Sequence, residues 1–143
     1  MCSIIDYSGK EIAAPIIVKG IKRMEYRGYD SVGVATESDN QIELKKGIGK
    51  VNLKIQLDTL PRKVGIGHTR WATHGKVTDV NVHPHPSNSG KIAIVHNGII
   101  ENFEELKKQL ENKEYGFKSE TDSEIIANLL QKNYELTKTS KKQ

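Results

Sequence analysis

The sequence predicts a mixed α/β or α+β domain. Strand-like and helix-like segments alternate along most of the chain, and 143 residues accommodate one domain rather than two. The composition, 36% hydrophobic and 28% charged, is typical of a globular protein. The chain has no apolar run near the ~20 residues of a membrane helix and no basic-then-apolar secretory signal. One cysteine excludes an internal disulfide. We therefore expect a cytoplasmic protein with no membrane partner.

The first half of the chain predicts a strand, a helix and a hairpin. Ser3 to Tyr7 is a short strand candidate, and apolar residues recur at helical spacing from Ile12 to Met24. Pro15 is compatible with that helix if it lies in the first turn. Ser31 to Thr36 and Gln41 to Lys46 are expected to pair as a hairpin across Ser38-Asp39-Asn40.

The second half continues the alternation. Val51 to Leu60 is expected to be helical, although Gly49 and the β-branched residues weaken that prediction. Strands are predicted at Val64 to Thr69 and at Lys91 to His96. Two further helices are predicted from apolar faces, whose residues are Phe103, Leu106 and Leu110 for the first and Ile125, Ile126, Leu129 and Leu130 for the second.

The net charge of +4 (22 basic minus 18 acidic residues) is concentrated at the C-terminus. Lys138, Lys141 and Lys142 supply +3 of it, so the rest of the chain carries about +1 by the same count. A nucleic-acid-binding protein needs a basic face on its folded body, so no nucleic-acid partner is expected. Residues 137–143 are predicted to be a polar, basic tail, and residues 1–136 to form the domain.

Cys2 is the first candidate for chemistry. A lone cysteine is often just a small buried residue. If Met1 is removed, however, Cys2 carries a free α-amine, whose ordinary pKa is about 7.7–8.0. One residue would then hold both the nucleophile and the general base, so no histidine partner is needed.

Two further segments could bind a substrate. The polar stretch from Arg70 to Gly90 follows a strand, and within it Arg70 offers a planar fork for a carboxylate. Thr73 and His74 add hydrogen-bond donors, and Trp71 could cover a pocket. At the end of the Lys91 to His96 strand, the Asn97 amide and the Gly98 N–H could hold an oxyanion, or form a plain Asn-Gly turn.

Two clusters have simpler interpretations. The acidic run from Ser119 to Glu124 precedes an apolar helix, so its spacing favours helix capping, with ammonium binding by Asp122 as the alternative. The five histidines invite a metal site, but no cysteine pair or carboxylate set accompanies them. We therefore expect no metal and no cofactor.

Taken together, these segments resemble the glutaminase domain of the glutamine–fructose-6-phosphate aminotransferase (glucosamine-6-phosphate synthase) family, through about Leu136. The resemblance rests on motifs in the family's order, which are Met1-Cys2, Glu25 to Ser31, His68 to Gly75, Asn81 to His85, Val95 to Asn102 and Ser119 to Asp122.

The resemblance implies an α+β N-terminal-nucleophile fold, two sheets between helix layers in an αββα sandwich. It implies that Cys2 attacks the amide of L-glutamine, forming a γ-glutamyl thioester and releasing ammonia destined for fructose-6-phosphate. It implies that Asn97 and Gly98 form the oxyanion hole and that Arg27 helps to position the nucleophile. It also implies that Arg70, with Thr73 and His74 beside it, holds the glutamine carboxylate and that Asp122 binds the ammonium. Trp71 is expected to gate the pocket and the ammonia path, and His83 and His96 to be structural residues that line the site through hydrogen bonds.

Two departures from the family's pattern carry expectations of their own. Ser3 and Asp6 stand where the family usually has glycine, so Ser3 is expected to crowd the thiol or cost stability, and Asp6 to place a charge in a buried strand. The family's domain is also longer, which implies a sandwich incomplete at its C-terminus. The chain is then an active glutaminase half, completed by a separate isomerase/synthase chain or fragment, or an inactive remnant or regulatory fragment lacking the isomerase domains.

Overall fold

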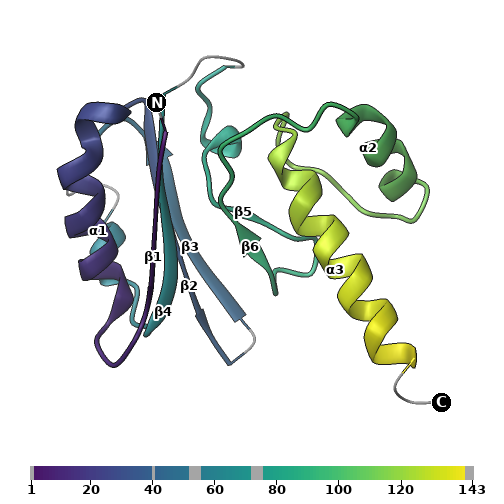
Figure 1. Ribbon diagram of the computed structural model, residues 1–143, viewed down its shortest axis with the longest axis horizontal. Helices are drawn as coiled ribbons and strands as arrows, with labels where there is room; N and C mark the ends of the chain where they lie inside the picture. The colour runs from purple at the N-terminus through teal and green to yellow at the C-terminus, as the bar shows by residue number, and fades with distance from the viewer. Residues whose placement is uncertain (1, 40, 52–55, 72–75, 141–143) are drawn as a thin grey trace.

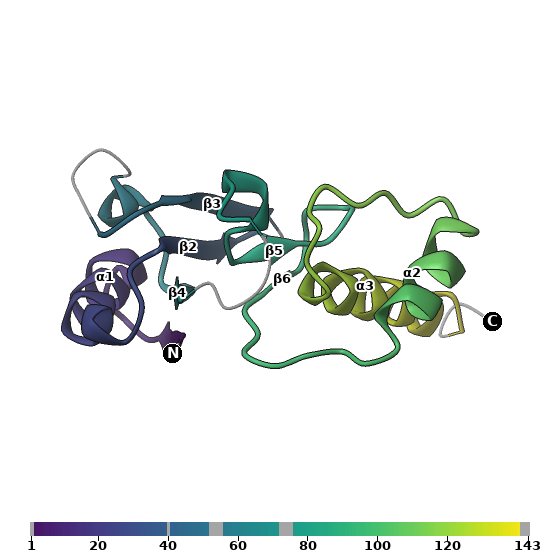
Figure 2. The ribbon, with the colours of Figure 1, turned by 90° about the horizontal axis from the view of Figure 1, so that it is seen from above.

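The computed structural model describes residues 2–39, 41–51, 56–71 and 76–140. Its strands and helices form four layers, helix–sheet–sheet–helix, in the α+β arrangement that the resemblance implies (Figures 1 and 2). The elements in chain order are β1 (Ser3–Ser8), α1 (Ala13–Met24), η1 (Glu25–Arg27), β2 (Ser31–Ser38), β3 (Gln41–Ile48), η2 (Leu57–Thr59), β4 (Val64–Arg70), η3 (Asp79–Asn81), β5 (His85–Pro86), β6 (Ala93–Ile94), α2 (Phe103–Glu111) and α3 (Ser123–Ser140).

The larger sheet has four antiparallel strands in the order β1-β4-β2-β3. Its β2–β3 pair is the predicted hairpin, with Ser38 opposite Gln41 and Asp39 in the left-handed region at φ 53°. β1 lies at one edge and pairs only with β4, Ser3 opposite Thr69. The N-terminal end of the chain is therefore fixed beside the end of β4.

One face of this sheet packs against α1, which forms the first outer layer (Figure 1). Ile17 and Ile21 of α1 are fully buried there among the aliphatic residues of β2. Gly67 of β4 lies directly beneath them, and a Cβ at that position would come within 2.7 Å of Ile21 Cδ1. The glycine allows the helix to approach the sheet closely, since any side chain there would displace it.

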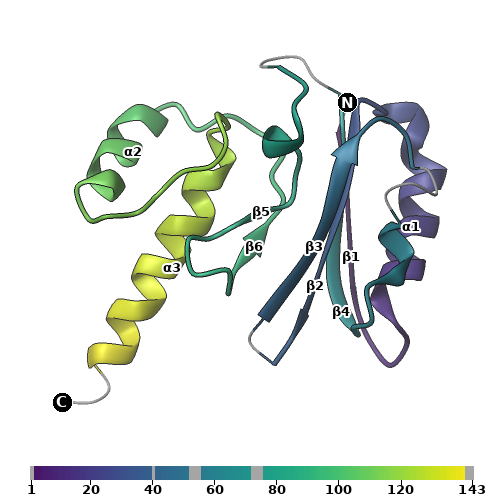
Figure 3. The same ribbon diagram turned by 180° about the vertical axis from the view of Figure 1, so that it is seen from behind.

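The other face of the sheet meets the second layer, the short β5–β6 pair, with α3 behind it (Figure 3). α3 is joined to the turn between β5 and β6 by two side chains, because Asn128 Oδ1 accepts the Asn88 N–H (2.8 Å) and Gln131 Oε1 accepts the Ser89 N–H (2.8 Å).

The two sheet layers meet through polar contacts. The Lys46 ammonium, from β3, donates to the carbonyl oxygens of Val80 (3.4 Å), Val82 (2.6 Å) and Pro84 (3.3 Å) in the chain leading to β5. Gly33 of β2 lies so close to this segment that a Cβ there would be 2.9 Å from Pro84 Cδ. The contact between layers is therefore tight and directional.

The structure differs from several sequence expectations. The helix predicted over Val51 to Leu60 is absent from its described part: Gln56 has φ 47°, and only η2 follows, while residues 52–55 lie outside the described residues. The strand predicted at Lys91 to His96 is limited to Ala93–Ile94. The polar stretch after Arg70 contains η3 and β5.

Three further features concern Asp6, the C-terminal segment and the membrane. The expectation that Asp6 would be buried is wrong, because β1 is an edge strand and Asp6 is exposed. α3 continues to Ser140, so the first part of the segment expected to be a tail is helical. Within the described part of the chain, no helix combines the length and apolarity needed to cross a bilayer.

Candidate active site

Strand alternation decides which side chains share a face with Cys2. Gly65 and Gly67 of β4 face α1, so His68 and Arg70 face the second layer. Ile4 is paired with His68, so its side chain is on the same face of the sheet. Side chains alternate along an extended chain, so Cys2, two residues before Ile4, is on that face as well. The Cys2 Sγ is half-buried and lies 3.9 Å from the carbonyl oxygen of Trp71. The structure therefore brings Cys2 to the end of β4 that carries Arg70 and Trp71.

Ser3 points the other way. It is opposite Thr69 on the α1 face, and it is 5% exposed. The expectation that Ser3 would crowd the thiol is therefore wrong, because its side chain lies on the face opposite that of Cys2. Its hydroxyl has no hydrogen-bond partner among the described residues, so the cost to stability stays a prediction.

Asn97 is anchored by a buried histidine. His68 Nε2 lies 2.8 Å from Asn97 Oδ1, and a carbonyl oxygen can only accept, so His68 donates from Nε2. Burial lowers the pKa of His68 to about 4, so the ring is neutral near pH 7. Because the oxygen of the Asn97 amide accepts this bond, the NH2 group at the other end of the amide is left as its donor.

Gly98 follows Asn97 in an exposed bend. A Cβ on Gly98 would lie 2.7 Å from His96 Nε2, so close approach to that ring, rather than a left-handed φ, accounts for the glycine. His96 Nδ1 in turn lies 3.1 Å from Ser123 Oγ, which agrees with the hydrogen-bonding role expected of His96.

Asp122 does not cap α3 with its side chain in the described structure. Its Oδ2 accepts the Ile100 N–H at 2.7 Å, and its Oδ1 accepts from Ser123 Oγ at 3.3 Å. The carboxylate thus holds the chain just beyond Asn97 and Gly98. The capping interpretation favoured by spacing alone is wrong, while ammonium binding by Asp122 stays a prediction.

Arg70 and its neighbours are held from both sides. The Arg70 carbonyl accepts the Asp30 N–H (3.0 Å), and the Arg70 Nη1 donates to the Asn81 carbonyl (3.4 Å). Arg27 ends η1, and a Cβ on the following residue, Gly28, would lie 2.9 Å from the Arg70 carbonyl carbon. Arg27 therefore lies next to the end of β4, beside the segment that carries Arg70.

Trp71 lies beside a tyrosine at the rim of this site. The residue is 41% exposed, and its ring meets that of Tyr29 edge to face, with centroids 5.2 Å apart. Thr73 and His74, the other two residues expected to bind the glutamine carboxylate, lie outside the described residues.

Sequence reasoning missed Glu124 as a buried acceptor. Only 4% exposed, its carboxylate accepts the Lys118 N–H (2.9 Å), the Ser119 N–H (2.7 Å) and the Ser119 hydroxyl (2.6 Å). These bonds shape the segment that leads to Asp122. Glu124 belonged to the acidic run, but a short-range pattern does not distinguish a surface carboxylate from a buried one.

Three histidines stack between the layers. The rings of His68 and His83 stack with centroids 4.4 Å apart and planes inclined by 30°, and the ring of His83 meets that of His85 edge to face, with centroids 4.4 Å apart. Burial, followed by neighbouring positive charge, lowers the pKa of His83 to about 2 and that of His85 to about 3. Neither ring nitrogen of His83 has a partner among the described residues, so the expectation that His83 acts through hydrogen bonds is wrong.

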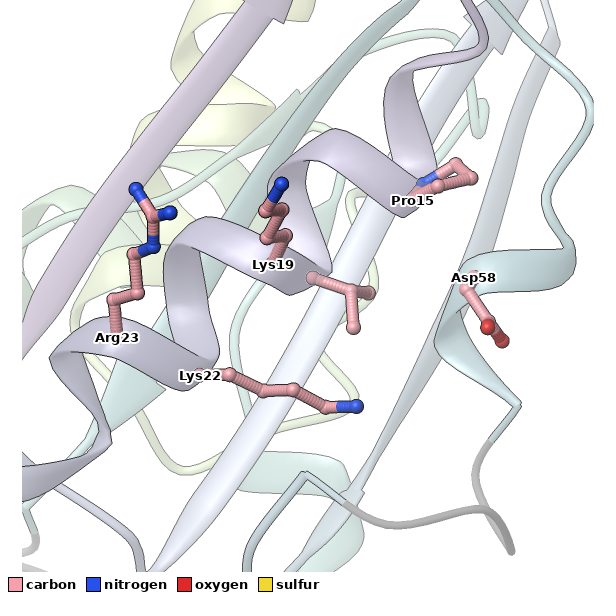
Figure 4. A pocket seen from close by; sticks show the side chains of 6 residues that line it. Pro15, Lys19, Lys22, Arg23 and Asp58 are labelled. Carbon is pink, nitrogen blue, oxygen red and sulfur yellow. The ribbon is translucent and has the colours of Figure 1, made fainter.

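Two other features of the structure lie apart from Cys2. Residues 2–39, 41–51, 56–71 and 76–140 contain no group of three or more His, Cys, Asp or Glu residues placed to hold a metal ion. A hollow of about 390 Å³ lies beside α1 and is lined by residues of that helix and by Asp58 of η2, and Figure 4 shows the Lys22 side chain extending toward the side where Asp58 lies. This hollow is separated from Cys2 by the sheet, because Cys2 lies on the opposite face.

Comparisons with known proteins point to one family. The sequence profile of the glutamine amidotransferase domain matches residues 55–139. Curated relatives include the glutamine–fructose-6-phosphate aminotransferases (isomerizing) of Pyrococcus horikoshii, 52% identical over 96% of this chain, and of Bacteroides thetaiotaomicron, 54% identical over 92%. The chain spans only 23% and 22% of the length of these two relatives.

Two solved structures share the fold. The glutamine phosphoribosylpyrophosphate amidotransferase from B. subtilis, complexed with ADP and GMP, has a TM-score of 0.75 and 30% identity over 92% of this chain and 29% of its own. The allosteric regulatory enzyme of purine biosynthesis has a TM-score of 0.76 and 29% identity over the same two fractions.

Proposed function

The chain belongs to the glutamine amidotransferase domain family, and on that premise we propose that it carries the glutaminase half-reaction, in which Cys2 releases ammonia from L-glutamine. The observation that supports this most strongly is the placement of Cys2, Arg70 and the His68-anchored Asn97 at one end of β4. The activity requires removal of Met1, which lies outside the described residues.

The nucleophile and its base belong to one residue. The Cys2 α-amine, once free, has an ordinary pKa of about 7.7–8.0, so a useful fraction is unprotonated near neutral pH. It takes the thiol proton, directly or through water, as the sulfur attacks the side-chain carbonyl carbon of glutamine. Arg27, next to the end of β4, helps to position the nucleophile.

The tetrahedral intermediate places a negative charge on the former carbonyl oxygen. The Asn97 NH2 and the Gly98 N–H donate to that oxygen, and the His68 bond keeps the Asn97 amide in the orientation that presents its donors. The C–N bond then breaks, and the ammonia leaves with the proton from the α-ammonium. Water hydrolyses the γ-glutamyl thioester, which yields glutamate and regenerates the thiol.

The α-amino acid end of glutamine meets residues of opposite charge. The Arg70 guanidinium pairs with the carboxylate, joined by Thr73 and His74, and the Asp122 carboxylate pairs with the ammonium. Trp71 covers the pocket and the ammonia path. Because the full-length relatives are aminotransferases, we propose that the ammonia is destined for fructose-6-phosphate on a synthase domain or chain.

The test is covalent capture by 6-diazo-5-oxo-L-norleucine, a glutamine mimic that alkylates such cysteines. We expect intact mass spectrometry of the purified chain to show Met1 absent and one adduct on Cys2, accompanied by ammonia release from glutamine. Cys2→Ser is the matched control and should take no adduct. A retained Met1, or an unlabelled wild-type chain, would identify the chain as an inactive fragment.

A further inference from the structure

Asn81 connects the two segments that carry the proposed glutamine-binding charges. It ends η3 and is 1% exposed. Its Oδ1 accepts the Glu120 N–H at 2.9 Å, and its Nδ2 donates to Glu120 Oε2 and to the Lys76 carbonyl, both at 3.3 Å. Its backbone carbonyl accepts from Arg70 Nη1 at 3.4 Å. A single buried residue therefore contacts Arg70 on one side and the segment leading to Asp122 on the other.

We propose that Asn81 is a positioning residue that sets the separation between the Arg70 guanidinium and the Asp122 carboxylate. This inference rests on the proposed function, in which those two groups bind the carboxylate and ammonium of one glutamine molecule. Arg70 and Asp122 come from distant parts of the sequence and from different layers, so each needs a contact that places it relative to the other. Asn81 contacts Arg70 directly through its backbone carbonyl. It acts on Asp122 indirectly, because its side chain holds Glu120, two residues before Asp122.

The chemistry of the carboxamide suits this position. Asn81 must accept one hydrogen bond and donate two, and among side chains of its size only asparagine does both. An aspartate would keep the acceptor, lose both donors and place a second charge beside the Glu120 carboxylate. An alanine would leave the Glu120 N–H and the Lys76 carbonyl without their partner.

The residues on either side of Glu120 are held by contacts that do not involve Asn81. Ser119, on one side of Glu120, is held by the Glu124 carboxylate, and Thr121, on the other, lies 3.0 Å from His85 Nε2. Both of those anchors belong to the second layer and its helix. Among the described residues, Asn81 contacts both this segment and Arg70 of the larger sheet, so loss of its side chain should alter the spacing of the two charges without unfolding the segment.

The experiment compares wild type, Asn81→Ala and the matched control Asn128→Ala on two substrates. Asn128 is equally buried and also accepts a backbone N–H, but it lies on α3 away from the site. The substrates are L-glutamine and 4-carbamoylbutanoate, which lacks the α-ammonium. For L-glutamine we expect Asn81→Ala to raise KM by about tenfold or more while kcat stays within about threefold. The substitution removes the side-chain hydrogen bonds to Glu120 and Lys76, whereas the backbone carbonyl of residue 81 still accepts from Arg70.

The second substrate separates positioning from general damage. Without an ammonium, 4-carbamoylbutanoate does not use Asp122, so its kcat/KM should be the same in wild type and Asn81→Ala. Asn128→Ala should leave KM for both substrates unchanged. An equal loss on both substrates, or an unchanged KM for L-glutamine in Asn81→Ala, would overturn the inference.

A binding measurement keeps this test apart from that of the proposed function. If the wild-type chain releases no ammonia, the proposed function fails, and calorimetric binding of L-glutamate, which carries the same two charged groups, then decides the role of Asn81. A roughly tenfold weaker affinity in Asn81→Ala supports it, and equal affinity or no binding by wild type overturns it. If Asn81→Ala does not fold, the nearly isosteric Asn81→Asp replaces it with the same expected weakening.

Discussion

Lowering the pH from about 7.5 to about 5.5 should destabilise the fold through the three stacked histidines. The pKa values of His68, His83 and His85 are lowered to about 4, about 2 and about 3, below the ordinary value of 6.5. The unfolded chain therefore takes up protons first as the pH falls. The stability that these rings contribute is complete above about pH 7.5 and is lost as the pH falls through 6.5 toward the folded-state values.

The size of the effect follows from the number of rings. Each histidine that is charged only in the unfolded state costs about 1.4 kcal/mol per pH unit below 6.5. Three of them at about pH 5.5 give a loss of up to about 4 kcal/mol, a large part of the roughly 5–15 kcal/mol that a domain has. Urea unfolding at pH 7.5, 6.5 and 5.5 measures the free energy directly.

A variant isolates one ring of the stack. His83→Phe keeps an aromatic ring between His68 and His85 and breaks no hydrogen bond that the described structure shows. Its loss of stability between pH 7.5 and 5.5 should be smaller than that of wild type by about 1.4 kcal/mol, because one titrating group is gone. All other groups are shared, so the difference belongs to His83. Equal losses in the two proteins, or a wild-type stability that does not fall, would refute the reasoning.

Three other substitutions have expected outcomes. Asn97→Ala should lower kcat for glutamine by about 10²–10³, the effect expected for the loss of one oxyanion donor. The control Asn133→Ala, on the exposed side of α3, should leave kcat unchanged. An unchanged kcat in Asn97→Ala would contradict the role proposed for Asn97. Gly67→Ala should cost about 1–3 kcal/mol in urea unfolding because α1 is displaced, and Gly116→Ala, where a Cβ meets only a side-chain oxygen at 3.4 Å, should cost far less. Ser3→Ala should raise stability by about 1 kcal/mol by removing an unpartnered buried hydroxyl, with no change in ammonia release, and a changed rate would contradict the placement of Ser3 on the α1 face.

The spacing of apolar residues along the sequence predicted the helices and strands that bury one face and expose the other. The β2–β3 hairpin, α1, α2 and α3 follow from apolar spacing, because each has one buried face. The helix expected at Val51 to Leu60 shows the limit of that reasoning. Leu57 and Leu60 are indeed buried, but they reach the core from an irregular segment that includes a left-handed Gln56. Apolar spacing indicated their burial and not their backbone conformation.

The candidate site could be predicted where the proposed chemistry rests on single residues. Cys2, Arg70 and Asn97 were identified from residue type and place in the sequence, and the structure brings Cys2 close to the end of β4 that carries Arg70. Asn81 and Glu124 act through hydrogen bonds whose partners depend on how separate segments pack. The histidine stack depends on the meeting of two layers, so no local pattern in the sequence could indicate it.

The hydrogen bonds between Lys46 and three carbonyl oxygens restrict how the two sheet layers can move relative to each other. A purely hydrophobic interface between two sheets resists separation of the sheets but permits them to slide, because dispersion attraction has no preferred direction. The Lys46 ammonium opposes such sliding, because its hydrogen bonds to the three backbone carbonyl oxygens are directional and would be broken by a displacement of one layer along the other. The proposed reaction depends on placement of its groups to within about 1 Å. These hydrogen bonds oppose sliding of the sheet that begins with Cys2 against the layer that leads to Asn97.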